Sequence, residues 1–337
     1  MDGVSIVSLM KAWTSVLAGK EDEVPPLMSF KQDPVELISA GSKAKPESYV
    51  LHKWMLKGTS FYKFVANQMS EMVWYPGVET RMICLPGALI ARLKSQAVDD
   101  VKSAQIDAGK DEKSFVSAGD AVSAWIARIA VSALRLPLSQ PVALANVLDT
   151  RGVVGTQILS DGTAYAGNMC VQFFTYVSAG ELAEESLGAT ALRIRRALDE
   201  QRTVQQFEAY VATHKEATAA GRLSLFGPWN MVMMNLSNWH KARFFEYDFS
   251  AAIRQCPAED GMVSVGENGT RAGGKPAYIS TTGHENVPVS SRNVGCLVGK
   301  DREGNWWMNW TMRKGAWPAF VEVAKTSAAK ASYGGES

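Results

Sequence analysis

The chain has 337 residues, of which 46% are hydrophobic and 20% charged, a composition typical of a globular protein of about two domains. Its 35 basic and 34 acidic residues leave a formal charge of +1, which argues against nucleic acid or an anionic membrane as a partner. The sequence contains neither an apolar run of the roughly 18 residues that span a membrane nor a basic leader. We therefore expect a cytoplasmic protein.

The four cysteines form no recognisable metal or disulfide pattern. They are far apart in the sequence, with no CxxC pair and no histidine three to five residues away: Cys84, Cys170, Cys256 and Cys296. We expect reduced cysteines and no zinc site.

The first part of the chain begins with a clear helix. Apolar residues at steps of three and four predict an amphipathic helix over residues 5–18. The pattern then loosens, with a short apolar piece at 61–65, a strand-like piece at 82–85 and a helical stretch at 87–104. We interpret the charged segment 108–113 as a linker between domains.

The second part of the chain alternates between helical and strand-like patterns. Ser117 followed by Asp120 is a capping sequence, and it predicts a helix that ends before Pro137. Further elements follow in order: a strand at 142–148, a helix at 180–198, a strand at 231–236, a hairpin of 294–298 and 306–311, and a helix at 317–330. This order, without internal repeats, predicts α/β layers.

Several familiar catalytic patterns are absent or incomplete. Gly269, Gly274 and Lys275 resemble a phosphate-binding loop, but Pro276 occupies the position that needs Ser or Thr. Neither GxSxG nor HExxH occurs, so the sequence predicts neither an α/β-hydrolase nor a zinc protease. We interpret the histidines as surface or core residues, with His240 the strongest catalytic candidate among them: His52, His214, His240 and His284.

Four short motifs follow one another in an order found in a known family. They are an Asp-x-Arg pair ending at Arg151, a Tyr-Ala-Gly-Asn turn at 165–168, Ser-Asn-Trp at 237–239 and Asp-Phe at 248–249. This series resembles the BAHD-type acyl-CoA-dependent acyltransferases, especially the fungal trichothecene 3-O-acetyltransferase-like members. The family's other hallmark is His-x-x-x-Asp-Gly before an amphipathic helix, and the chain matches it from Asp2 and Gly3 onward.

The resemblance implies an α/β fold, the chloramphenicol-acetyltransferase-like two-domain sandwich, with an incomplete first domain. Residues 1–107 would be the remainder of the N-terminal domain plus the crossover segment, 114–330 the C-terminal domain and 331–337 a flexible tail. The motif histidine belongs four positions before Asp2, so we expect the chain to be the later part of a longer family member.

The resemblance also assigns residues to the reaction. Asp2 is the motif aspartate, which holds the catalytic loop without acting on the substrate. Ser237 and Trp239 lie at the oxyanion or acceptor pocket. Ser117 and Asn168 lie where the family binds CoA, although a helix cap and a turn explain both residues equally well.

Arg151 and Asp248 match a family pair that forms an internal ion pair away from the reacting atoms. Ser250 departs from the family pattern, because a glycine normally follows Asp-Phe. Glycine often marks a close backbone approach, so the tightness of this loop is in question.

The function that the resemblance implies is transfer of an acyl group, acetyl above all, from acyl-CoA to a hydroxyl of a secondary metabolite. Acyl-CoA is a co-substrate, and we expect no permanently bound cofactor and no metal. The expected partners are therefore acyl-CoA and a small-molecule alcohol, and the complete protein is expected to be a monomer. Two alternatives stay open: a non-catalytic remnant or binding protein of the same fold, and a condensation-domain-like enzyme. The sequence does not identify the acceptor.

Overall fold

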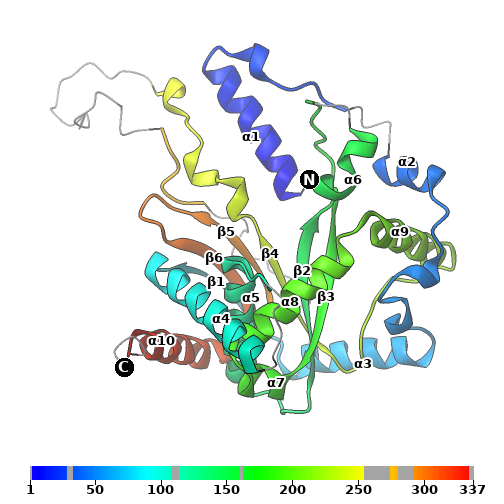
Figure 1. Ribbon diagram of the computed structural model, residues 1–337, viewed down its shortest axis with the longest axis vertical. Helices are drawn as coiled ribbons and strands as arrows, with labels where there is room; N and C mark the ends of the chain where they lie inside the picture. The colour runs from blue at the N-terminus through cyan, green and yellow to red at the C-terminus, as the bar shows by residue number, and fades with distance from the viewer. Residues whose placement is uncertain are drawn as a thin grey trace.

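A mixed six-stranded sheet runs through the protein (Figure 1). The computed structural model describes residues 2–28, 33–107, 114–159, 162–253, 274–279 and 291–333. The strands are ordered β1-β6-β5-β4-β2-β3 across the sheet. Their bounds are β1 Val78–Leu85, β2 Pro141–Asp149, β3 Cys170–Ser178, β4 Val232–Asn238, β5 Val294–Lys300 and β6 Trp306–Arg313.

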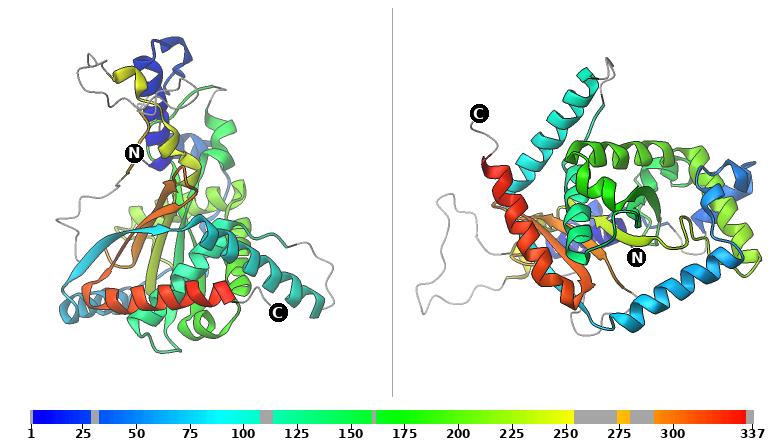
Figure 2. Two further views of the ribbon diagram at one scale, coloured as in Figure 1. Left: turned by 90° about the vertical axis from the view of Figure 1, so that its left-hand side faces the viewer. Right: turned by 90° about the horizontal axis from the view of Figure 1, so that it is seen from below.

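Helices α4, α5, α8 and α10 pack on one face of this sheet and enclose the main hydrophobic core (Figure 2). Within the described ranges the α-helices are α1 Gly3–Leu17, α2 Pro34–Gly41, α3 Thr59–Trp74, α4 Gly87–Asp107, α5 Ala118–Leu134, α6 Arg151–Ile158, α7 Ala179–Glu184, α8 Leu187–Gln201, α9 Val204–Ala219 and α10 Trp317–Tyr333.

The two faces of the sheet differ because side chains alternate along each strand. On β6, Trp306, Met308, Trp310 and Met312 belong to the main core under the helices. The residues between them are more polar, and Asn309 Oδ1 accepts a hydrogen bond from the Cys296 N–H at 2.8 Å. On β6 the face opposite the four helices therefore carries more polar side chains, whereas on β2 and β3 that face contributes Ala145 and Phe174 to a second hydrophobic cluster.

The strand directions gather several chain segments at one edge. β4 runs parallel to both β2 and β5, so these three strands end at the same edge of the sheet. β3 is antiparallel to β2, and Cys170 at its start lies opposite Asp149 at the end of β2. α1 begins beside this edge (Figure 1).

The mixed α/β architecture predicted from the sequence is confirmed, and most of the expected elements are present. The helix expected over 180–198 is instead two helices, because Ser186 caps a new helix start and accepts a hydrogen bond from the Ala189 N–H. The apolar piece at 61–65 lies within α3. The sequence interpretation missed α2, β3, α6 and α9.

The predicted division into domains stays a prediction. The proposed linker 108–113 lies outside the described residues, as do Cys256, His284 and most of the phosphate-loop-like segment. β1 and α4, which precede that linker, join the same sheet and the same helical layer as the elements after it. Each helix in the described part of the chain falls short of the length and apolarity that a bilayer crossing demands.

Ser117 provides a test of the helix start that the sequence predicted. Its side chain accepts a hydrogen bond from the Asp120 N–H, and the Asp120 carboxylate accepts one from the Ser117 N–H. Asp120 also binds Arg195. We expect Ser117→Ala to lower the free energy of unfolding by about 1 kcal/mol and Asp120→Ala by about 3 kcal/mol, since the second change leaves Arg195 without its partner. Urea titrations measure both, and equal losses would contradict this division of roles.

Candidate active site

A buried ion pair lies at the start of α1. Asp2 is the N-cap of this helix, and its Oδ1 accepts a hydrogen bond from the Ser5 N–H at 2.9 Å. Its Oδ2 accepts from Arg151 Nη1 at 2.9 Å and from the Met169 N–H at 2.6 Å. The side chains of Asp2 and Arg151 are 6% and 12% exposed. The pair therefore joins α1, the start of α6 and the segment before β3.

Arg151 bridges the remaining segments of the site. Its Nη1 also contacts Asp149 Oδ1 at 2.9 Å, at the end of β2. Its Nη2 donates to the Gly167 carbonyl at 2.9 Å and to the Tyr165 carbonyl at 3.2 Å. The Ser5 hydroxyl, which is fully buried, lies 3.0 Å from the same nitrogen. One guanidinium thus holds four segments of the chain together.

Hydrogen bonds keep the Asp2 carboxylate ionised despite its burial. Burial by itself raises the pKa of Asp2, but hydrogen bonds from Arg151, the Met169 N–H and Ser5 outweigh it, so the pKa lies below its ordinary value of 3.8. Burial likewise lowers the pKa of Arg151, whereas its contacts with Asp2 and Asp149 raise it, with a net increase. Both groups are charged at neutral pH.

Gly3 explains why the motif needs glycine after the aspartate. A Cβ atom built on Gly3 would lie 2.8 Å from the indole ring of Trp239, so any larger residue would force one of them to move. Trp239 follows β4, and its backbone N–H donates to the Leu297 carbonyl at 2.8 Å. The structure therefore brings Trp239 to the start of α1, next to Asp2.

Ser237 and His240 lie on either side of Trp239 in the sequence. The Ser237 side chain hydrogen-bonds the buried thiol of Cys296. The His240 ring stacks on Trp306 with 4.9 Å between ring centroids, and its Nδ1 lies 3.0 Å from Asn238 Oδ1. Burial, assisted by Lys241, lowers the pKa of His240. These contacts support the interpretation of His240 as a packed residue.

Ser117 and Asn168 occupy different surroundings. Ser117 caps α5, as its sequence context predicts. Asn168 is exposed in the segment that contributes Gly167 and Met169 to the ion pair, and its Oδ1 accepts a hydrogen bond from the Cys170 thiol at 3.2 Å. Asn168 therefore lies at the site, whereas Ser117 has a complete structural role.

The predicted ion pair between Arg151 and Asp248 is wrong. Arg151 pairs with Asp2 and Asp149 instead, because it begins α6 at the edge of the sheet where α1 starts. Asp248 lies at the surface and accepts a hydrogen bond from the Ser250 N–H at 2.8 Å. The carboxylate partner of the arginine thus comes from the Asp-Gly motif.

The loop around Ser250 packs closely against Gly274, a residue from a distant segment. The Phe249 N–H donates to the Gly274 carbonyl at 2.7 Å, and a Cβ atom on Gly274 would lie 2.5 Å from Ser250 N. Gly274 has φ +104°, a region that favours glycine. The close backbone approach at this loop is thus made by a glycine on the opposing segment, while position 250 holds serine.

The sequence interpretation missed Ser5, the partnership of Asp149 with Arg151 and the backbone donor at Met169. Ser5 had a usable signal, because a polar residue three positions after an N-cap aspartate commonly completes the cap. The backbone N–H of Met169 carries no such signal, since any residue except proline provides one. No group of His, Cys, Asp and Glu suited to a metal occurs among the residues described.

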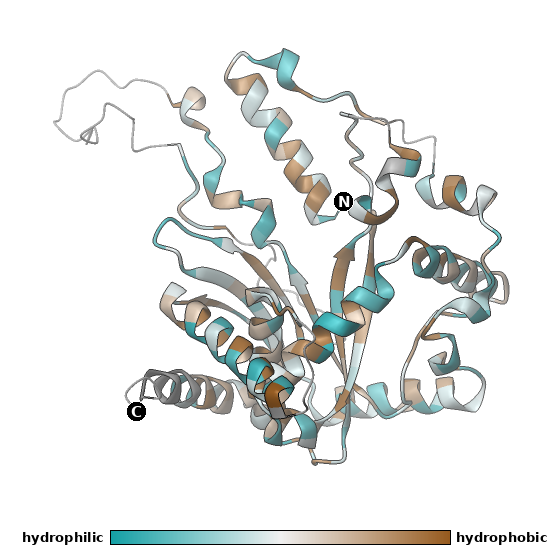
Figure 3. Ribbon diagram, in the orientation of Figure 1, coloured by the Kyte–Doolittle hydropathy of each residue, from teal (hydrophilic) through white to brown (hydrophobic). Residues whose placement is uncertain are grey.

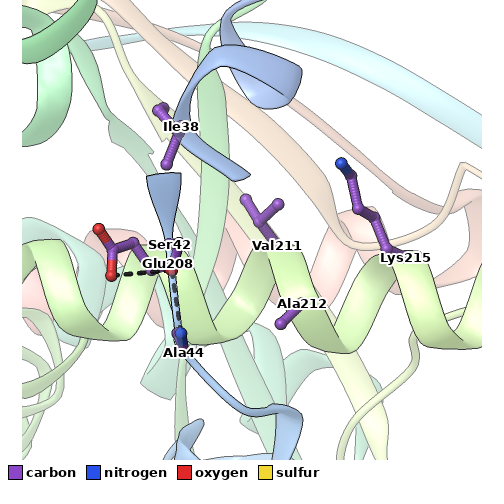
Figure 4. A pocket seen from close by; sticks show the side chains of 7 residues that line it. All are labelled: Ile38, Ser42, Ala44, Glu208, Val211, Ala212 and Lys215. Atoms are coloured by element: carbon purple, nitrogen blue, oxygen red, sulfur yellow. Dashed lines mark hydrogen bonds between the residues drawn. The ribbon is translucent and has the colours of Figure 1, made fainter. Parts of the chain in front are cut away.

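A small pocket lies between α2 and α9 (Figure 4). Its volume is about 180 Å³. Ile38 and Val211 line it and belong to the same hydrophobic cluster as Met169, whose N–H binds Asp2. The pocket and the ion pair are therefore connected through packed side chains.

The ion pair predicts a strong energetic coupling between Asp2 and Arg151. We expect Asp2→Ala and Arg151→Ala each to lower the free energy of unfolding by about 3 kcal/mol or more, because each leaves a buried charge unpaired. The double variant should lose much less than the sum. Urea titrations of all four proteins measure the coupling. The matched control is the double-mutant cycle of Asp248→Ala and Arg151→Ala. There the losses in unfolding free energy should be additive within about 0.5 kcal/mol. Strong coupling in this cycle would instead support the ion pair between Arg151 and Asp248 that the sequence predicted.

The lowered pKa of Asp2 predicts a loss of stability in acid. A carboxylate whose pKa is lower in the folded state contributes stability above its unfolded value of about 3.8, and that contribution disappears as the pH falls through the folded pKa. The difference in unfolding free energy between the wild type and Asp2→Asn should therefore be constant above about pH 5 and shrink as the pH falls through 3.8 and below. Other carboxylates are common to both proteins. A difference that stays constant with pH would contradict the ionised state of Asp2.

Comparisons with known proteins identify relatives along most of the chain. Acetyltransferase adrJ of Penicillium roqueforti is 33% identical over 318 residues, which are 94% of this chain and 62% of adrJ. Acetyltransferase sphE of Aspergillus fumigatus is 31% identical over 323 residues, 94% of this chain and 61% of sphE. The chain thus spans less than two thirds of the length of these relatives.

A solved structure has the same fold. TRI101 of F. graminearum, crystallised with coenzyme A and T-2 mycotoxin, matches 98% of this chain and 63% of its own with a TM-score of 0.67 and 18% identity. This match confirms the chloramphenicol-acetyltransferase-like fold that the motifs implied. The sequence model of the Transferase family matches residues 1–252. The chain therefore belongs to this transferase family, the BAHD-type acyltransferases that its motifs resemble.

Proposed function

We propose that the complete protein is an acyl-CoA-dependent O-acyltransferase that moves an acetyl group to a hydroxyl of a small secondary metabolite. The observation that carries the proposal is the Asp2–Arg151 ion pair, which seats the motif aspartate at the edge of the sheet where β2 and β4 end. The names of adrJ and sphE support acetyl transfer. The complex of TRI101 with coenzyme A and a toxin supports the two substrate classes.

In the proposed reaction, the family histidine four positions before Asp2 removes the proton from the acceptor hydroxyl. Its unperturbed pKa of about 6.5 suits that role near neutral pH. The acceptor oxygen forms a bond to the thioester carbon, the carbon–sulfur bond breaks, and the CoA thiolate leaves and takes the proton. Asp2 positions the loop, because both of its oxygens are already occupied by Ser5, Arg151 and Met169.

Trp239 is the better of the two predicted donors to the oxyanion. The Ser237 side chain is engaged with the Cys296 thiol. Within the described ranges, the indole N–H of Trp239 has no hydrogen-bond acceptor, and the ring lies against Gly3. A free N–H beside the motif loop is the type of group that stabilises charge developing on a thioester oxygen.

The remaining assignments are part of the same proposal. Asn168 is the favoured CoA contact, since its exposed side chain lies in the segment that binds Asp2, whereas Ser117 is engaged as a helix cap. The acceptor is a small alcohol. We place the protein in the cytoplasm as a monomer, which a fluorescent fusion and light scattering on the complete protein would test.

The test compares two proteins in an assay with radiolabelled acetyl-CoA and a panel of terpenoid and polyketide alcohols. One is residues 1–337, and the other is the same chain extended by the coding sequence immediately upstream. We expect the extended protein to transfer acetyl about 10² to 10⁴ times faster, because it brings the general base. Replacing that histidine with alanine should return the rate to that of residues 1–337.

The controls separate transfer from binding. Trp239→Phe keeps the ring but removes the N–H, so it should lower kcat about tenfold or more with little effect on the affinity for CoA measured by calorimetry. His240→Ala should leave the transfer rate within a factor of about three. CoA binding without turnover in the extended protein would favour the binding-protein alternative. Turnover that depends on His240 would overturn the assignment of the base.

A further inference from the structure

The pocket between α2 and α9 is separate from the ion pair of the candidate active site. The two helices lie side by side (Figure 1), and Figure 3 shows hydrophobic positions on both. Neither Asp2 nor Arg151 is among the residues that line the pocket. Its volume is about 180 Å³, and a cavity of about 150 Å³ already admits benzene. The pocket can therefore hold a small organic molecule.

The floor of the pocket is apolar and well packed. Ile38 from α2 and Val211 from α9 are 6% and 4% exposed, and both belong to one hydrophobic cluster. Ala44 and Ala212 add small side chains to the lining. Close packing fixes the shape of the floor, and the alanines leave the volume above it open. Such a floor favours a branched aliphatic group on the ligand.

One end of the pocket carries a carboxylate that is held in place. The Ser42 hydroxyl donates to Glu208 Oε2 at 3.0 Å and accepts from the Ala44 N–H at 3.1 Å. Glu208 is half-buried, and no lysine, arginine or histidine in the described part of the chain forms an ion pair with it. A carboxylate accepts several hydrogen bonds, so Glu208 Oε1 can bind a further donor. This end of the pocket therefore fits a cationic group.

The opposite end of the pocket carries a positive charge. Lys215 lines the pocket seven residues after Glu208 on α9, and side chains at this spacing lie on the same face of a helix. The two Cα atoms are about 10.5 Å apart along the helix axis, and Val211 lies between them (Figure 4). A lysine ammonium group has several N–H donors, so Lys215 can bind a ligand carboxylate in addition to its contact within the protein.

We infer that this pocket binds a free α-amino acid with a small aliphatic side chain, of the size of leucine. The ammonium group of the ligand binds Glu208, its carboxylate binds Lys215, and its side chain lies on Ile38 and Val211. The two protein charges lie at opposite ends of the pocket, so a zwitterion matches both of them. An amine leaves Lys215 without a ligand partner, and a carboxylate leaves Glu208 without one. The inference does not rest on the proposed acetyl transfer.

The bound amino acid connects two distant segments of the chain. Ser42 follows α2, and it is 166 residues from Glu208 on α9. The floor belongs to the same hydrophobic cluster as Met169, whose N–H binds Asp2. A ligand that binds only the folded chain stabilises it in proportion to ligand concentration and affinity. The amino acid should therefore raise the thermal midpoint of the chain.

Isothermal titration calorimetry on residues 1–337 tests the inference with L-leucine and three matched probes. 3-Methylbutylamine lacks the carboxylate, 4-methylpentanoate lacks the ammonium group, and glycine lacks the aliphatic side chain. We expect leucine to bind at one site with a Kd below about 1 mM. Each probe should bind at least about tenfold more weakly, because each loses one charged contact or the burial of the aliphatic group.

Variants on α9 locate the ligand. Glu208→Gln keeps the shape of the side chain without its charge, so it should weaken leucine binding at least about tenfold. Lys215→Gln should weaken leucine about threefold or more and leave 3-methylbutylamine unchanged, since that probe has no carboxylate. Ala212→Leu fills the pocket and should weaken leucine and 3-methylbutylamine alike. The matched control is Glu216→Gln, because Glu216 is exposed on α9 but does not line the pocket.

The control should bind leucine as the wild type does. Thermal midpoints without ligand show whether each variant keeps its fold, and Lys215 is exposed, so Lys215→Gln provides a test even if another variant unfolds.

Four results would overturn the inference. The first is the absence of leucine binding up to about 10 mM. The second is equal affinity for leucine and glycine, which would mean that the apolar floor takes no part. The third is equal affinity for leucine and 3-methylbutylamine, which would make the ligand a simple amine. The fourth is leucine binding that neither Glu208→Gln nor Ala212→Leu weakens. None of these measurements uses acetyl transfer, so the proposed function stands or fails separately.

Discussion

The ion pair between Asp2 and Arg151 is the interaction on which the arrangement of the candidate site depends. It connects the start of α1 with the end of β2 and with the segment before β3. Asp2 and Arg151 themselves are 149 residues apart in the sequence. Two buried charges are costly unless each finds partners for its remaining hydrogen-bonding groups. Here Ser5, Met169 and the carbonyl of Gly167 provide those partners. The pair therefore fixes geometry more than it adds stability.

The sheet supplies the rigid frame for this pair. Parallel strands bring their carboxyl ends to one edge, so residues that follow β2 and β4 become neighbours. The four helices pack on one face of the sheet, and smaller hydrophobic clusters and polar side chains share the other face. Asp149 and Trp239 reach the site for this reason, although neither is near Asp2 in the sequence. The direction of the strands thus brings these residues of the candidate site together.

The contrast between α5 and the helices α1 and α3 divides the molecule into a packed and an unpacked part. α5 is enclosed by the sheet and neighbouring helices, with a complete capping box at its start. α1 carries Asp2 at its start, and Leu9, Trp13 and Val16 along it are exposed. Asp2 is therefore held by its buried contact with Arg151 at the start of a helix in which Ser5 is the one buried residue described.

Local patterns in the sequence determined the elements and the family. Apolar periodicity predicted α1, α5 and β2, because a core requires the same face to recur along each element. The Ser117 cap was predictable because a cap depends on residues three positions apart. The motifs around Arg151 and Ser237 led to the transferase family for the same reason, since each is a short run of residues whose order does not depend on the fold.

Tertiary structure alone decided which residues meet. Asp248 and Asp2 are both aspartates, and only the position of α1 beside the end of β2 makes Asp2 the partner of Arg151. Gly274 approaches Ser250 closely because two distant segments of the chain meet there. The exposure of residues along α1 and α3 is likewise invisible in the sequence, where 5–18 has the pattern of an amphipathic helix and 61–65 that of a short apolar piece. Burial and charge pairing are properties of distance in space, and a local pattern carries no measure of that distance.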